Sequence, residues 1–124
     1  MTTPNINDST KNITGHHAAV SLGLNETTLI NNAATSNKLI RVAGIYVANK
    51  STTDVGAITM KIYNGGDLTG SSWFLASAIS VPVNTTMVLV DKNAPIYLRE
   101  DQSIGVVANN SSLLDVVISY EEIS

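Results

Sequence analysis

The chain has 124 residues, of which 44% are hydrophobic and 14% charged, with a net charge of −3 and no cysteine. A chain of this length forms one domain with a core of its own. Its weak negative charge excludes the basic surface that nucleic acid or an anionic membrane requires. The lack of cysteine excludes disulfides and thiolate metal sites, and no apolar run approaches the ~20 residues of a membrane helix. We therefore expect neither a nucleic-acid nor a membrane partner.

Residues 1–16 are polar, rich in Thr, Asn and Asp, and have almost no hydrophobic periodicity. Such a segment cannot bury enough apolar surface to offset the entropy of ordering it. We therefore predict an extended N-terminal arm over residues 1–16, followed by a single β-sandwich domain over residues 17–124. A neighbouring subunit is the expected cover for the arm.

The rest of the chain consists of short apolar stretches separated by Gly, Asn and Ser turns. Clean alternation over Ala57–Asn64 predicts that Ile58, Met60 and Ile62 point inward and that Tyr63 points outward. Turn signals recur about every ten residues, and no stretch has the length and period of a helix. The strands expected in chain order are Ala18–Leu24, Thr27–Asn32, Lys38–Asn49, Ala57–Asn64, Trp73–Val81, Met87–Asp91, Ile96–Arg99, Ser103–Ala108 and Leu113–Glu121.

Short strands at this spacing predict an all-β fold in which two antiparallel sheets pack as a sandwich. A jelly-roll-like arrangement is our first choice, and an immunoglobulin-like sandwich is the alternative. The same pattern excludes coiled coils, βαβ folds and repeat architectures.

The strand Lys38–Asn49 is apolar on both faces, with Ile40 and Val42 on one face and Ile45 and Val47 on the other. The antiparallel sheets of an isolated sandwich normally have one apolar and one wet face. We therefore expect the second face to be covered by the arm, by a loop or by another copy of the chain. A central strand under a long loop is an equal alternative. On this reasoning Ile45 and Val47 are candidate subunit contacts.

Residues that could carry chemistry form no recognisable constellation. His16 and His17 are adjacent on an extended chain, so they point to opposite sides and cannot hold one ion together. The carboxylates are spread over turns and strand ends, without the converging pair that acid–base catalysis needs. Asp67 in its Gly-rich loop is more typical of a turn than of a calcium site. We predict no enzyme activity, no cofactor and no metal site.

Trp73 is the only tryptophan, and it follows Ser71 and Ser72 at the start of a predicted strand. An exposed aromatic ring beside polar groups can stack on a sugar, but a lone tryptophan is more often an anchor in a core or an interface. Trp73 is therefore a candidate contact residue. A carbohydrate-binding or host-adhesion module, with Trp73 and the loop Gly65–Gly70 as its site, is the alternative function.

The stretch from Lys38 to Ser124 resembles small β-sandwich virion proteins of tailed bacteriophages. The likeness rests on a strand ending in Val-Ala-Asn, a strand with a polar Asn-Gly end, a VPxNTT turn and an ending near DVVISYEEI. These features lie in the segments IRVAGIYVANKSTTDVGAITMKIYNGG and ASAISVPVNTTMVLVDKNAPIYLREDQSIGVVANNSSLLDVVISYEEIS. The likeness is a rhythm of strands and turns and includes no catalytic motif.

The resemblance implies a capsid decoration (cement) protein that binds the outside of the shell and bridges and stabilises capsid subunits. A head–neck or tail component is the alternative within the same class. The expected partners are the chain itself, as a homotrimer, and the major capsid protein or another virion protein. Because no signal peptide is visible, we expect synthesis in the host cytoplasm and a final place in the virion. The arm residues expected to contact neighbouring chains are Thr3, Asn5, Asn7 and Lys11.

Overall fold

The computed structural model describes residues 12–91, 93–110 and 113–124, and these ranges contain nine β-strands and no helix. The predicted all-β fold is confirmed, and all nine predicted strands are present. None of the described segments is a helix that could cross a membrane. The strands are β1 (Ile13–Ser21), β2 (Thr27–Asn32), β3 (Leu39–Asn49), β4 (Gly56–Gly65), β5 (Thr69–Val81), β6 (Thr86–Val90), β7 (Ile96–Leu98), β8 (Gln102–Ala108) and β9 (Leu114–Ile123).

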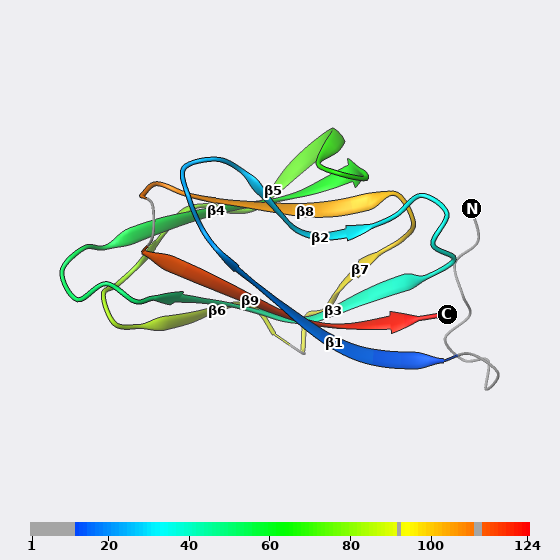
Figure 1. Cartoon of the computed structure of the whole chain (residues 1–124), viewed down its shortest axis with the longest axis horizontal. Coiled ribbons are helices and arrows are strands. Elements are labelled where there is room, and N and C mark those ends of the chain that lie inside the picture. The colour runs from blue at the N-terminus through cyan, green and yellow to red at the C-terminus, as the bar shows by residue number, and fades with distance from the viewer. Residues whose placement is uncertain (1–11, 92, 111–112) are drawn as a thin grey trace.

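The strands form two antiparallel sheets that pack face to face (Figure 1). The five-stranded sheet has the order β1-β9-β3-β6, with β7 also paired to β3, and the four-stranded sheet has the order β2-β8-β4-β5. The pairs β1–β9, β2–β8, β3–β6 and β4–β5 are nested within one another, so the chain is one long hairpin rolled into a sandwich. This nesting is the jelly roll, and the immunoglobulin-like alternative is wrong.

A β-bulge explains why β3 has apolar residues on both sequence faces. Its register with β9 shifts between Val42 and Gly44, so inward-facing positions are even-numbered before the shift and odd-numbered after it. Ile40 and Val42 on one side of the bulge, and Ile45 and Val47 on the other, are all at most 3% exposed in the same core. The prediction that Ile45 and Val47 contact a neighbouring chain is therefore corrected, because their side chains are enclosed within their own sandwich.

The core lies between the two sheets and is almost entirely aliphatic. Burying one such side chain contributes about 1.5–3 kcal/mol. Aromatic rings are missing from the set of largest fully buried side chains, although the partly buried Tyr120 packs against the core. That set comprises Ile45, Ile58, Met60, Leu98, Ile104, Leu114, Ile118, Val42, Val47, Val81, Val106 and Val116.

Two buried asparagines connect the sheets near opposite ends of β3. Asn32, at the end of β2, donates from Nδ2 to the carbonyl oxygen of Leu98 in the other sheet at 3.1 Å. Asn49, at the end of β3, donates from Nδ2 to the carbonyl oxygen of Val81 in the other sheet at 2.9 Å. Each amide also binds a second carbonyl in a neighbouring loop. Since both side chains are at most 2% exposed, these bonds hold the two layers together away from water.

The first strand begins at Ile13 and not at the predicted Ala18. It pairs with β9 from Ile13, opposite Ile123, to Ser21, opposite Asp115. Residues 13–16 therefore belong to the sheet, where backbone pairing holds a polar segment that lacks apolar periodicity. The predicted arm contacts Thr3, Asn5, Asn7 and Lys11 lie outside the described residues.

Candidate assembly surfaces

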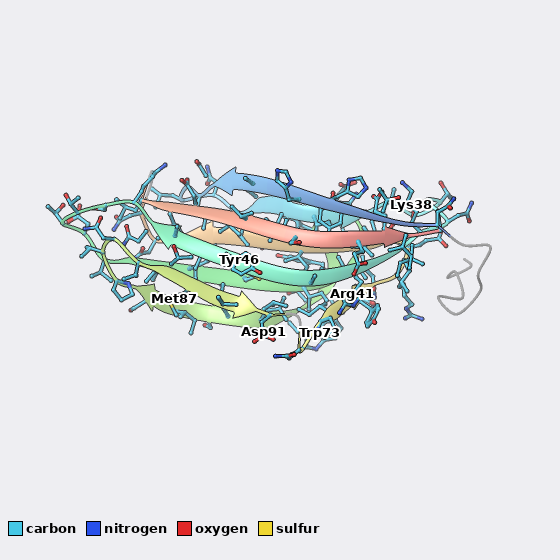
Figure 2. The ribbon with its side chains drawn as sticks, turned by 90° about the horizontal axis from the view of Figure 1, so that it is seen from below. Lys38, Arg41, Tyr46, Trp73, Met87 and Asp91 are labelled. Carbon is cyan, nitrogen blue, oxygen red and sulfur yellow. The ribbon has the colours of Figure 1, made fainter. Side chains whose placement is uncertain are left out.

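The exposed face of the five-stranded sheet carries apolar side chains in a row across four strands. Ala19 of β1 lies opposite Val117 of β9, Val117 opposite Tyr46 of β3, and Tyr46 opposite Val88 of β6. All four side chains are exposed, Val88 by 54%. Tyr46 lies near the middle of this face (Figure 2). We name these four residues the apolar row.

The bulge that encloses Ile45 also places Tyr46 on the outer face. The sequence pattern put Tyr46 on the same side as Val42, but the register shift between Val42 and Gly44 separates them. A Cβ atom at Gly44 would lie 2.6 Å from the Tyr46 hydroxyl oxygen, so the tyrosine lies down across the glycine. The centre of this face is therefore aromatic and apolar, which is the composition found at the middle of protein interfaces.

Charged groups on either side of the apolar row are paired. Arg41 Nη1 donates to Glu121 Oε1 at 2.7 Å, and Lys50 Nζ donates to Asp115 Oδ1 at 3.1 Å. Figure 2 shows Arg41 well away from Tyr46 along the same face. Because both pairs are neutral, a partner seated on the row would meet no net charge from them.

The carboxylate of Asp115 accepts a second hydrogen bond, from Ser21 Oγ at 2.7 Å. This bond, together with Lys50, lowers the pKa of Asp115 below its ordinary value of 3.8. A lowered carboxylate pKa stabilises the fold above pH 3.8, and this contribution is lost as the pH falls through the lowered value.

We therefore expect Ser21→Ala to raise the pKa of Asp115 toward its ordinary value and to start the acid loss of stability at a higher pH. Titration of the carboxyl carbon by NMR between about pH 2 and 6 measures the shift directly. Ser119→Ala, on the same face, is the control and should leave the pKa of Asp115 unchanged. A titration curve that is the same in all three proteins would contradict the assignment.

The edge strand β5 exposes two large aromatic side chains. Trp73 is 58% exposed and Phe74 is 60% exposed, and as adjacent strand residues they project to opposite faces. Lys61 Nζ lies 5.0 Å from the centre of the Phe74 ring, a cation–π contact. In Figure 2, Trp73 and Met87 lie toward the same long edge of the sandwich. Trp73 has the exposure that a contact residue requires, and its contact remains a prediction.

A polar cavity of about 230 Å³ lies at the turn before β8. Its polar groups are engaged in local structure: Gln102 Nε2 donates to Asn64 Oδ1 at 3.1 Å, and the Arg99 backbone N–H donates to Gln102 Oε1 at 2.9 Å. The backbone N–H of Gly66 donates to Asp101 Oδ1 at 3.0 Å. These bonds fix the loop between β4 and β5 against the turn, which accounts for the side chains of Asn64, Asp101 and Gln102. The cavity is lined by Asn64, Arg99, Glu100, Asp101 and Gln102.

The two histidines have different surroundings at the start of β1. His16 stacks on Tyr120, with ring centres 5.5 Å apart, and its Nε2 lies 3.1 Å from Glu122 Oε1. Lys38 Nζ reaches the same oxygen at 3.2 Å. His17 lies opposite Ser119 in the β1–β9 ladder. Over the described ranges, no group of three or more His, Asp or Glu side chains is placed to hold a metal ion.

No protein-family model matches this chain, and no curated protein matches it. Solved structures with a similar fold include a chain from Bacillus endospore appendages, described as disulfide-linked pili. That chain is 11% identical, with a TM-score of 0.50, and the match covers 91% of this chain and 88% of that one. At this identity the likeness shows a shared fold: the chain is a jelly-roll sandwich.

Two further matches are capsid structures of infectious bursal disease virus. The T13 viral particle gives a TM-score of 0.49 at 11% identity, covering 91% of this chain and 31% of that one. The VP2 subviral particle gives a TM-score of 0.45 at 14% identity, covering 93% and 32%. This chain therefore spans about a third of the length of these viral chains.

Proposed function

We propose that this chain is a structural subunit of a virion and, more specifically, a capsid decoration protein that binds the outside of the shell. The observation that carries the proposal is the apolar row: four exposed, uncharged side chains across one sheet face, with Tyr46 among them and paired charges on either side. Exposed apolar surface of this kind, rimmed by polar groups, is typical of protein interaction sites. The likeness to tailed-phage virion proteins supports the same class.

The role is mechanical. Each copy would bury its apolar row against the shell and bridge neighbouring capsid subunits. Interfaces of ordinary size bury ~800 Å² per partner, and symmetry repeats such a contact many times over the particle. Many modest contacts together would resist expansion of the shell. The family likeness implies a homotrimer bound to the major capsid protein, whereas the open edge of β1 favours a dimer as the unit that binds the shell.

Contacts between copies would not include disulfides. The fold-related appendage protein is described as forming disulfide-linked pili, whereas this chain has no cysteine. Apolar burial, hydrogen bonds and backbone pairing are the contacts that we expect to hold its assembly together. These are the features concentrated on the apolar row and on the sheet edges.

The tested change is Tyr46→Lys, which places a charge at the centre of the apolar row. We expect the full-length variant to bind particles assembled without the chain at least tenfold more weakly, because a desolvated unpaired charge opposes burial. Co-sedimentation with those particles is the measurement. Thr52→Lys, in the exposed loop before β4, is the control with the same change in charge. Equal occupancy of the two variants would contradict the role of the row.

The second candidate function is carbohydrate binding, and the exposure of Trp73 is the observation that favours it. A sugar stacked on the ring would change the fluorescence of this single tryptophan. Titration with a panel of host-surface glycans separates the two functions. A saturable change that Trp73→Ser abolishes would support adhesion, and an unchanged spectrum across the panel would remove it.

A further inference from the structure

The five edge strands of the described chain contain no Lys, Arg, Asp, Glu or Pro. They are β1, β2, β5, β6 and the short β7, which pairs only with β3. Folded proteins normally protect edge strands with charges, with proline or with bulges, because an open edge is a template for another strand. Because these edge strands have neither such charges nor proline, β-bulges are the one remaining form of edge protection.

Three of the five edge strands have such bulges, and β7 has only three residues. The register of β2 with β8 shifts once, that of β6 with β3 shifts once, and that of β5 with β4 shifts at three points. β1 pairs with β9 without any shift over all nine residues. Within the described chain, β1 is therefore a long, straight edge that neither charge, proline nor bulge protects.

The backbone groups on the open side of β1 follow from the ladder itself. Asn12 and Ser124 exchange both backbone hydrogen bonds, at 2.8 and 2.9 Å. Because such pairs alternate along an antiparallel ladder, the even-numbered residues of β1 bond to β9. The N–H and C=O groups of the odd-numbered residues face the open edge, where no strand of the described chain lies. These residues are Ile13, Gly15, His17, Ala19 and Ser21.

We propose that two copies of this chain pair antiparallel through β1, about a two-fold axis, so that their five-stranded sheets become one continuous sheet. With the axis at His17 all nine residues pair, and Gly15 of one copy lies opposite Ala19 of the other. Every odd-numbered residue then lies opposite an odd-numbered residue of the other copy. The backbone N–H and C=O groups at the open edge of one copy can therefore bond to those of the other. This inference rests on the proposed function, because it identifies a second copy of the chain as the first partner in the proposed virion assembly.

A second copy suits this edge for two reasons. β1 carries no Lys, Arg, Asp or Glu, so its antiparallel copy places none of these like charges opposite one another. An antiparallel pair of identical strands also closes on itself, which gives a finite dimer and not an open fibre. In that dimer the two apolar rows lie on the same side of one extended sheet, where a single large surface such as a shell can contact both.

The test uses Ala19→Pro in the full-length chain. Proline at this position removes a backbone N–H that faces the open edge, and it leaves the hydrogen bonds between β1 and β9 intact, as edge positions allow. Light scattering and sedimentation should show that the natural chain has twice the 13.1 kDa mass of one copy. Ala19→Pro should raise the dimer dissociation constant at least tenfold. Ala19→Val, which keeps the N–H, should not.

His17→Lys gives a second variant that does not depend on the tolerance of the strand for proline. It would place like charges opposite one another at the two-fold axis, so the dimer should weaken at low salt and recover at high salt. Far-UV circular dichroism of each variant monitors the fold. A natural chain that is monomeric or trimeric at high concentration, or a dimer indifferent to both variants, would overturn the proposal.

Amide hydrogen exchange adds a signature that other dimers would not produce. In β1 the odd-numbered amides should be protected at high protein concentration and exposed on dilution, while the even-numbered amides stay protected throughout. Protection that is independent of concentration at every residue would contradict edge pairing. A dimer that never binds particles would support pairing through β1 and contradict the proposed function. A monomer that binds particles would support the proposed function and contradict pairing through β1.

Discussion

Replacing Ile45 with alanine should lower the free energy of unfolding by about 2–5 kcal/mol, the range for truncating a buried isoleucine. Ile45 is fully buried, and in register it lies opposite Ile118 of β9 and Val90 of β6. The neighbours are held by two sheets, so they can collapse only partly into the space. Urea unfolding followed by far-UV circular dichroism measures the change.

Val88→Ala is the matched control, because it also removes methyl groups from the five-stranded sheet. Val88 is on the outer face, so its truncation should change the free energy of unfolding by less than about 0.5 kcal/mol. Without the bulge, plain alternation would put Ile45 and Ile40 on opposite faces. Similar small losses for Ile45→Ala and Val88→Ala would therefore contradict the position of the bulge.

Replacing Asn49 with alanine should lower the free energy of unfolding by about 2–4 kcal/mol, because each buried polar group left without a partner costs ~1–3 kcal/mol. Its Nδ2 donates to the carbonyl oxygens of Asp54 and Val81, each at 2.9 Å. Its Oδ1 accepts from the backbone N–H of Ser51 at 2.9 Å. The substitution removes all three bonds. Thermal and urea unfolding both report the loss.

Asn109→Ala is the corresponding surface change. Asn109 is exposed, and its Oδ1 accepts one bond from the Ala57 backbone N–H at 2.8 Å. Water can replace that partner, so the loss should stay below about 1 kcal/mol. Equal stability of Asn49→Ala and the natural chain would show that the two sheets do not depend on the buried amide.

The sandwich was predictable because its signals are local. Turns at Asn64–Gly70 and after Val81 lie between apolar stretches of strand length, and each is recognisable without knowledge of the rest of the chain. Their spacing was enough to favour the jelly roll. The bulge in β3 had a weaker local signal, the glycine at position 44 inside a strand. Strict alternation was assumed along the whole strand, and it placed Ile45 and Val47 on the opposite face from Ile40 and Val42.

The remaining features depend on contacts between distant segments. Tyr63 is at an outward-facing position of β4, as predicted, but it is buried because Glu26 covers it. The Tyr63 hydroxyl donates a hydrogen bond to Glu26 Oε1 at 2.7 Å. The apolar row needs the register of four strands, which no single segment contains. The start of β1 is fixed by backbone pairing with β9. Backbone pairing does not depend on a particular pattern of side chains, so the sequence alone does not show where β1 begins.

Counting this chain in purified virions tests the central claim most directly. Quantitative mass spectrometry of washed particles, made by the host that produces the chain, gives its copy number relative to the major shell protein. A structural subunit that sits on a symmetric shell should appear at a fixed, reproducible ratio and should remain through washing in high salt, because the apolar row carries no charge to screen. A chain that is abundant in infected cells and missing from the washed particles would contradict the account.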